Sequence, residues 1–306
     1  MTAAVLVIGA SGFIGRHLTE AIAARGADVV AATRRPCSFD DPRIVNATDT
    51  FDTPASFMPF LERCSVVVHA ASSSSPASSV GAPLTELDKN LRSLLALVAA
   101  LQHHADRRLV YLSSAGTLYG DCDERADEDH PLCPRSYHGA AKAAAEHFLR
   151  AWSDQYGGNA TILRPSNVYG PGQHPREGFG VIPAAFEAAT HGNEFTVWGD
   201  GGSIRDYLYI DDLVDACLRA ITLSTSRRFE IFNVCQGVGF GLSQLLDAID
   251  ATTGTPLLRR HQPSRRTDIR RIVPSNDHAH MTLGWSPMVP LEEGLRRTWR
   301  WFSTRS

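Results

Sequence analysis

The sequence has no long hydrophobic run. Its longest late apolar stretch, residues 94–101, is too short to cross a bilayer. The first apolar run has no basic region before it and ends at Gly9, which indicates a strand and not a signal peptide. We therefore expect a soluble, cytoplasmic protein without a membrane partner.

The sequence also has no strong excess of one charge and no cluster of cysteines. The 30 Lys and Arg nearly balance the 33 Asp and Glu, and a net charge of −3 gives no basic field for nucleic acid. A disulfide framework is typical of short secreted chains, and a zinc site needs clustered ligands. Neither pattern exists among the six scattered cysteines, so we expect free thiols, a reducing compartment and no metal.

What is present is an alternation of short β-branched runs with longer helical stretches. Strands are predicted at residues 4–8, 28–32, 65–70, 108–113 and 161–164, and helices at 13–25, 84–102 and 137–152. Continuous apolar strands separated by helices imply a parallel sheet covered on both faces. The predicted fold class is α/β, a Rossmann doubly wound sheet with its ligand crevice at the carboxyl ends of the strands.

The amino-acid composition changes after Gly170, where Gly- and Pro-rich loops carry arginines and tryptophans. We expect residues 1–170 to form a Rossmann domain, to which the chain returns at about 206–233. Residues 171–306 should form mainly a smaller substrate-binding lid. The serine run at 72–75 is interpreted as a loop.

The loop after the first predicted strand has the spacing GxxGxxG and opens a helix. Its first glycine permits a tight turn, the second lets backbone approach a pyrophosphate, and the third lets helix and strand pack closely. The helix N-terminus offers free N–H groups and partial positive charge to phosphates. We expect a dinucleotide to bind at Gly9, Ser11, Gly12, Phe13, Ile14 and Gly15.

Cofactor choice depends on the end of the second strand, which reads Thr33-Arg34-Arg35 without an acidic residue. An acid there would bind the 2′-hydroxyl of NAD, whereas arginine accommodates the 2′-phosphate of NADP. These residues favour NADP, with NAD as the alternative. The other interpretation is that they form a solvated basic turn with no role in cofactor binding.

Further segments resemble the extended short-chain dehydrogenases, especially the NDP-sugar epimerases and dehydratases such as UDP-glucose 4-epimerase. The resemblance covers nearly the whole chain in order. It is carried by Asn90 and by residues 67–71 (VVHAA), 112–120 (LSSAGTLYG), 163–172 (LRPSNVYGPG), 198–207 (WGDGGSIRDY), 265–268 (RRTD) and 283–287 (LGWSP).

The resemblance implies NAD(P), a nucleotide-diphosphate sugar and a homodimer formed by the helices near 84–102 and 137–152. It adds Ala70, Ala71, Asn90, Ser113 and Lys142 to the expected cofactor site. The substrate would contact Asn167, Tyr207, Arg205 and Arg265, and the planar guanidinium forks of the two arginines suit the diphosphate.

The proton-transfer residues depart from the family pattern, in which a tyrosine precedes a lysine by four positions. Here Tyr137 precedes Lys142 by five, and His138 by four. Five positions rotate by about 140° along a helix and four by about 40°, so His138 shares the face of Lys142. The usual strand hydroxyl is replaced by Ala115, which leaves Ser114 and Thr117 as substitutes.

Three interpretations stay open. His138 replaces the tyrosine as the proton-transfer group, or the helix starts late and Tyr137 reaches the site, or turnover is impaired. The leading function is an NDP-sugar 4-epimerase. An NADPH-dependent 4-keto-deoxysugar reductase is the runner-up, ahead of a 4,6-dehydratase and a non-catalytic NADP-binding regulator.

Overall fold

The computed structural model describes residues 4–175, 180–265 and 268–304. The chain divides into two compact units. The first consists of the residues up to Ser114, Tyr137–Arg164 and Val214–Phe232. The second consists of Ala115–Ser136, Pro165–Leu213 and the residues from Asn233 onward.

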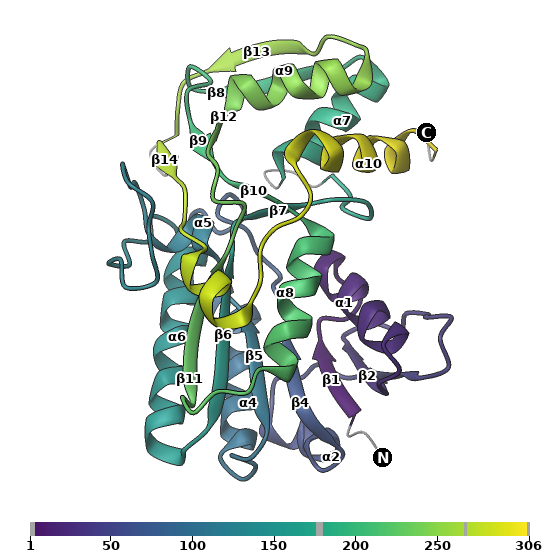
Figure 1. Cartoon of the computed structure of the whole chain (residues 1–306), viewed down its shortest axis with the longest axis vertical. Coiled ribbons are helices and arrows are strands. Elements are labelled where there is room, and N and C mark those ends of the chain that lie inside the picture. The colour runs from purple at the N-terminus through teal and green to yellow at the C-terminus, as the bar shows by residue number, and fades with distance from the viewer. Residues whose placement is uncertain (1–3, 176–179, 266–267, 305–306) are drawn as a thin grey trace. The chain divides into compact units, whose positions relative to one another are not determined.

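The first unit is built on a seven-stranded sheet of order β3-β2-β1-β4-β5-β6-β11 (Figure 1). β1 pairs in parallel with both β2 and β4, so the strand order reverses beside β1 and creates the crevice expected of a doubly wound fold. The predicted fold class is thereby confirmed. The strands are β1 (Ala4–Ile8), β2 (Val29–Thr33), β3 (Ile44–Thr48), β4 (Cys64–His69), β5 (Arg108–Leu112), β6 (Asn159–Pro165) and β11 (Phe229–Val234).

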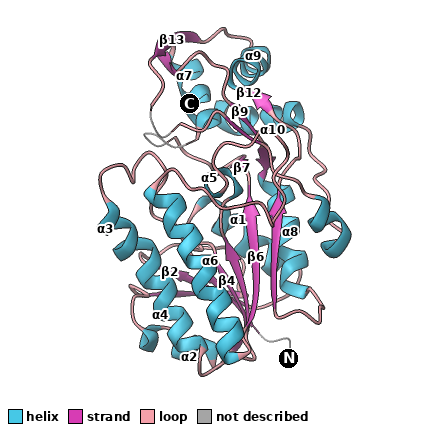
Figure 2. Ribbon diagram, turned by 90° about the vertical axis from the view of Figure 1, so that its left-hand side faces the viewer, coloured by secondary structure: helices cyan, strands magenta, loops and turns pink. Residues whose placement is uncertain are grey.

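Helices cover this sheet. Figure 2 shows α4 (Arg92–Leu101) and α6 (Tyr137–Tyr156) side by side on one face. Elsewhere α1 (Phe13–Ala24) and α8 (Ile210–Thr222) are joined by an ion pair of 3.6 Å between Arg25 and Asp215. Short helices at Pro54–Ser56 (η1) and α2 (Met58–Leu61) precede β4. Apolar side chains of the strands, such as Leu6 and Val67, form one core with Leu97 of α4 and Leu149 of α6.

The predicted helix at 84–102 consists of three parts. α3 (Pro83–Glu86) leads into a π-helical segment, η2 (Leu87–Leu91), and then into α4. Single π turns often occur at functional sites. This one lies between Glu86 and α4 and includes Asn90.

The described residues of the second unit form three small sheets. β7 (Asn167–Tyr169) pairs with β10 (Tyr207–Tyr209), and β8 (Glu194–Trp198) with β13 (Leu258–Gln262). β9 (Ile204–Arg205) lies between β12 (Phe240–Gly241) and β14 (Arg271–Ile272). Its helices are α5 (Ala115–Leu118), α7 (Val181–His191), α9 (Leu242–Thr253), η3 (Ala279–Leu283) and α10 (Leu291–Ser303).

The sequence predicted no strand at β3, whereas β11 lies where the chain was expected to return to the Rossmann domain. β3 is an edge strand in which only Ile44 and Ala47 are buried, so its apolar signal is short. All six cysteines are free, as expected. Among the described helices none is long and apolar enough to span a membrane.

Candidate functional site

The loop between β1 and α1 needs its glycines because the backbone approaches itself closely there. Gly9 has φ +88°, and a side-chain carbon there would lie 2.7 Å from the backbone of Ala71. A side-chain carbon at Gly15 would overlap the carbonyl oxygen of Gly9. Gly12 is the N-cap of α1 and supplies no side-chain cap, so N–H groups of the first turn are left for an anion. The loop therefore fits a dinucleotide pyrophosphate.

The end of β2 presents two exposed basic residues, Arg34 and Arg35. Thr33 before them is buried, and its hydroxyl donates to the carbonyl of Arg35 at 2.8 Å, which holds the turn. Within the described part of the chain, no carboxylate forms an ion pair with Arg34 or Arg35. Both guanidinium groups are thus available to an anionic ligand.

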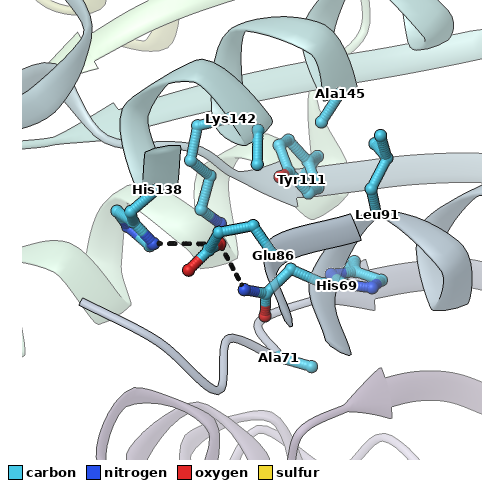
Figure 3. Close-up of a pocket in the computed structure, with 10 residues that line it drawn as sticks. His69, Ala71, Glu86, Leu91, Tyr111, His138, Lys142 and Ala145 are labelled. Carbon is cyan, nitrogen blue, oxygen red and sulfur yellow. Dashed lines mark hydrogen bonds and ion pairs between the residues drawn. The ribbon is translucent and has the colours of Figure 1, made fainter. Parts of the chain in front are cut away.

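A small pocket lies in the first unit, where α3, η2 and α6 meet the ends of β4 and β5. Figure 3 shows its polar lining converging from these elements. The polar residues that line it are His69, Glu86, Asn90, Tyr111, His138 and Lys142. Three of them, Asn90, His138 and Lys142, are residues that the sequence singled out.

The first two residues of α6 have opposite environments. α6 begins at Tyr137, so the helix does not start late. The Tyr137 side chain is 47% exposed and does not line the pocket, whereas His138 is 7% exposed and does. His138 and Lys142 are one turn apart on the same face. His138 and Lys142 thus share the pocket, and the phenol of Tyr137 does not line it.

The Lys142 ammonium is buried and held in place. It donates to the carbonyl oxygen of Leu112 at 2.7 Å and lies 4.8 Å from the centroid of the Tyr111 ring. Burial lowers the pKa of Lys142 to about 8, although the charges of Glu146 and Glu86 oppose this. The group is still mostly cationic at neutral pH.

The imidazole of His138 is fixed on one side. Its Nδ1 lies 2.9 Å from the hydroxyl of Ser74 and 3.9 Å from a carboxylate oxygen of Glu86, and its backbone N–H donates to Ser79 at 3.3 Å. Burial, and then the charge of Lys142, lowers the pKa of His138 to about 4. The ring is therefore neutral at pH 7 and able to accept a proton.

A second buried histidine lines the pocket. His69 ends β4, its ring lies 5.5 Å from that of Tyr111, and neither ring nitrogen has a hydrogen-bond partner among the described residues. Burial, with the charge of Lys142 second, lowers its pKa to about 3. Burial raises the pKa of Tyr111, so its phenol stays protonated.

The two serines at the end of β5 differ. Ser113 is buried and donates to a carboxylate oxygen of Glu146 at 2.5 Å. Glu146 also forms a buried ion pair of 2.6 Å with Arg164. The hydroxyl of Ser113 is thus committed to this network, while Ser114, the last residue of this segment of the first unit, is half-buried.

The other expected proton-transfer residue lies in the second unit. Thr117 is half-buried in α5, and Ala115 at the start of α5 is fully buried in an apolar cluster with Tyr119 and Ile272. The amide of Asn167 lies close to Gly116, since a side-chain carbon there would be 3.6 Å from its Oδ1. Asn167 therefore lies next to the segment that carries Ala115 and Thr117.

The expected substrate residues of the second unit lie on two adjoining strands. Asn167 pairs with Tyr207 across β7 and β10, and its amide donates to the carbonyl of Asp206 at 2.8 Å. Asp206 is buried and accepts backbone N–H groups from residues 236–238 and the hydroxyl of Ser166. This carboxylate holds both strands in place. Burial raises the pKa of Tyr207 to about 12.

The two expected phosphate-binding arginines differ in their partners. Arg205 is half-buried and donates to the carbonyls of Ile204 and Ile269, with no ion pair to a carboxylate among the described residues. Burial lowers its pKa. Arg265 is more exposed, pairs with Asp268 at 3.3 Å and lies 4.9 Å from the centroid of the Trp198 ring. Arg205 therefore has unused capacity for an anion.

The chain is similar to known proteins along most of its length. The profile of the NAD dependent epimerase/dehydratase family matches residues 5–235. The chain belongs to that family.

Individual relatives cover the whole chain. A UDP-glucose 4-epimerase of Mycolicibacterium smegmatis is 33% identical, over 98% of this chain and 99% of its own length. A dTDP-4-dehydro-6-deoxy-D-allose reductase of Streptomyces bikiniensis is 30% identical, over 97% and 95%. The crystal structure of the Thermus thermophilus UDP-glucose 4-epimerase in complex with NAD has a TM-score of 0.91 at 31% identity, and the match covers 99% of this chain and all of that one.

Two residues beside His138, Glu86 and Ser74, were not predicted from the sequence. Ser74 contacts the ring of His138, and Glu86 lies 3.9 Å from it. Ser74 belongs to the serine run at 72–75, for which the sequence predicted only a loop. The only local signal was the spacing of Glu86 and Asn90, four residues apart on one helical face; their side chains are joined at 2.7 Å.

Proposed function

We propose that the protein is an NDP-sugar 4-epimerase in which His138 is the proton-transfer group. The observation that carries the proposal is the shared pocket of His138 and Lys142, with Tyr137 turned to solvent. The family match and the epimerase relatives support the reaction class.

In this reaction the C4 hydroxyl of the sugar loses its proton to His138 while C4 loses a hydride. A bound nicotinamide would supply the acceptor for that hydride and the donor for its return to the other face of the 4-keto sugar. His138 then returns its proton to the C4 oxygen and is neutral again. The pKa of His138, lowered to about 4, keeps the imidazole in its accepting form well into mildly acidic conditions.

Lys142 serves the cofactor in this proposal. Its ammonium is fixed by the Leu112 carbonyl and would bind the hydroxyls of the nicotinamide ribose. The same charge lowers the pKa of His138 and disfavours its premature protonation. Ser114 and Thr117 are the proposed hydroxyl donors for the C4 oxygen in place of Ala115.

The substrate diphosphate would be met by Arg205 and Arg265. Arg205 forms no ion pair with a carboxylate within the described residues, so its guanidinium can still bind a phosphate. Asn167 and Tyr207, paired across β7 and β10, would contact the substrate beside them.

We further propose NADP as the preferred cofactor, because Arg34 and Arg35 are exposed and lack acidic partners in the described part of the chain. The Thermus thermophilus relative was solved with NAD, which keeps NAD as the alternative. These arginines, with the reductase relative from Streptomyces bikiniensis, also favour a second candidate, an NADPH-dependent reductase of 4-keto-deoxysugars.

A homodimer through α4 and α6 is proposed as well. Leu84 and Leu87, which precede α4, and Phe148 of α6 are large apolar side chains left exposed on this side of the sheet. Their burial against a second copy would be favourable. Light scattering of the purified protein, compared with a Phe148→Glu variant, would test the assembly.

The two functions are separated by one assay. The protein is incubated with UDP-, dTDP- and GDP-hexoses and either NAD or NADP, and separately with the NDP-4-keto-6-deoxyhexoses and NADPH, while proton NMR follows the sugar and absorbance at 340 nm follows the cofactor. An epimerase forms the C4 epimer without net change in absorbance. A reductase consumes NADPH in a one-to-one ratio with a 4-keto sugar and forms no epimer from a hexose. Neither result with any sugar would overturn both.

A further inference from the structure

The pocket holds a buried carboxylate that the proposed reaction does not yet use. Glu86 is 3% exposed, and its Oε1 has no hydrogen-bond partner among the described residues. Its Oε2 accepts from the amide of Asn90 at 2.7 Å and lies 3.9 Å from Nδ1 of His138 (Figure 3). Burying a carboxylate costs free energy unless it is paired with an opposite charge or hydrogen-bonded.

The orientation of the Asn90 amide follows from its neighbours. The backbone N–H of Ser73, which can only donate, points at the amide oxygen of Asn90 at 2.9 Å. The amide nitrogen therefore donates its two hydrogens, one to Glu86 and one to the hydroxyl oxygen of Ser74, each at 2.7 Å. Ser74 is an acceptor toward Asn90 and keeps a second lone pair for another donor.

The remaining lone pair and the hydroxyl hydrogen of Ser74 are both open to His138, because Nδ1 lies 2.9 Å from Ser74 Oγ, so this contact allows either direction of the hydrogen bond. A lone pair on Nδ1 would face the buried carboxylate of Glu86, which is repulsive. A hydrogen on Nδ1 would face the carboxylate favourably and donate to Ser74. The Glu86 carboxylate therefore favours the Nδ1–H form of the ring, from which the Ser74 hydroxyl can accept, and Nε2 is then the atom able to accept a proton.

We propose that Glu86, with Ser74 and Asn90, is the positioning group of His138: it holds the ring as the Nδ1–H tautomer and stabilises the imidazolium formed when Nε2 takes a proton. The inference rests on the proposed function, since it takes His138 as the proton acceptor. A third group that orients a catalytic base is a recurrent arrangement.

The charges around the ring explain why such a group is needed. Lys142, one turn along α6, disfavours protonation of His138, and so does burial. His69 and Tyr111 on the sheet side are neutral, and Glu146 is paired with Arg164. Among the described residues, Glu86 is the anion that faces the imidazole.

The test compares the unmodified protein with Glu86→Gln, which keeps the shape and the acceptor for Asn90 but removes the charge. Nitrogen-15 NMR of histidine-labelled protein reports the tautomer, with the His138 signals assigned from a His138→Gln variant. We expect Nδ1–H in the unmodified protein and a shift toward Nε2–H in Glu86→Gln. Turnover should fall about ten- to a thousandfold, since an opposite charge at this distance moves a pKa by about one to three units.

Asp88→Asn is the matched control. Asp88 lies two residues on, in η2, and its carboxylate pairs with Arg92 at 2.7 Å on an exposed surface. This variant loses the same charge outside the pocket and should keep both the tautomer and the turnover. Cofactor affinity should stay unchanged in both variants.

An Nε2–H signal in the unmodified protein, or an unchanged tautomer with full turnover in Glu86→Gln, would overturn the inference. A tautomer that responds to Glu86 in a protein that turns over no NDP-sugar would support the positioning network and refute the proposed function instead. A lower melting temperature with an unchanged tautomer would reduce Glu86 to a structural role and reject the inference.

Discussion

Tyr137 and His138 are neighbours in the chain, yet the first is 47% exposed and the second 7% exposed. The difference arises because α6 begins at Tyr137, so consecutive residues are about 100° apart around its axis. The imidazole lies with Lys142 in the pocket, and the phenol does not. This relationship carries the first prediction.

His138→Ala should lower turnover by about two to four orders of magnitude, the usual contribution of a positioned proton-transfer group. Tyr137→Phe, which removes only an exposed hydroxyl, should keep at least half of the activity. Steady-state rates on the best NDP-sugar measure both, and circular dichroism checks folding. An inactive Tyr137→Phe beside an active His138→Ala would return the chemistry to the tyrosine.

Acid should destabilise the protein through its two buried histidines. The pKa values of His69 and His138 are lowered to about 3 and about 4 from 6.5, so below pH 6.5 the unfolded chain binds protons that the folded chain does not. Stability is therefore full above pH 6.5 and is lost as pH falls toward these values. Urea unfolding should show a loss of about 2 kcal/mol per buried histidine between pH 6.5 and pH 5.

His69→Leu should show a shallower fall in stability with acid, because one of the two neutral rings is gone. His103→Leu, at an exposed position, serves as the control and should fall as steeply as the unmodified protein. Parallel curves for all three proteins would contradict the assignment of the acid sensitivity to His69.

Arg34→Ala should remove a preference for NADP over NAD. Loss of one charged hydrogen bond to the 2′-phosphate corresponds to about 1.5–3 kcal/mol, or roughly a tenfold to hundredfold weaker NADP, with NAD unaffected. Titration calorimetry with both cofactors measures this. Arg43→Ala is the control, because that arginine is paired with Asp41 at 2.6 Å. Tighter binding of NAD by the unmodified protein would refute the preference.

Arg205→Ala should weaken binding of an NDP-sugar by about 2 kcal/mol or more, because a buried phosphate loses a charged partner. Cofactor affinity should barely change. Arg259→Ala, whose guanidinium is paired with Asp247 and Asp250 in the same unit, should leave sugar binding intact. Equal weakening of both ligands in Arg205→Ala would show that this residue supports the fold and not the substrate.

Local patterns in the sequence were enough for the main elements of the fold. The glycine loop at Gly9–Gly15 follows a strand and opens a helix. The turn and the helix start depend on residues that are close together in the chain, so the sequence alone shows them. The pairing of His138 with Lys142 on one face also follows from helical periodicity alone. β3 escaped because an edge strand with two buried side chains carries little apolar signal.

By itself the sequence determined the parallel Rossmann sheet, the glycine loop and the helix face that carries His138 and Lys142. Which side of α6 would be buried, and what would meet His138 there, was decided only by the tertiary structure. Ser74 and Glu86 reach the ring from 64 and 52 residues away, and no local propensity encodes such a contact. They meet because the loop after β4 and the end of α3 pack against the first turn of α6, where burial turns ordinary polar residues into one hydrogen-bonded network.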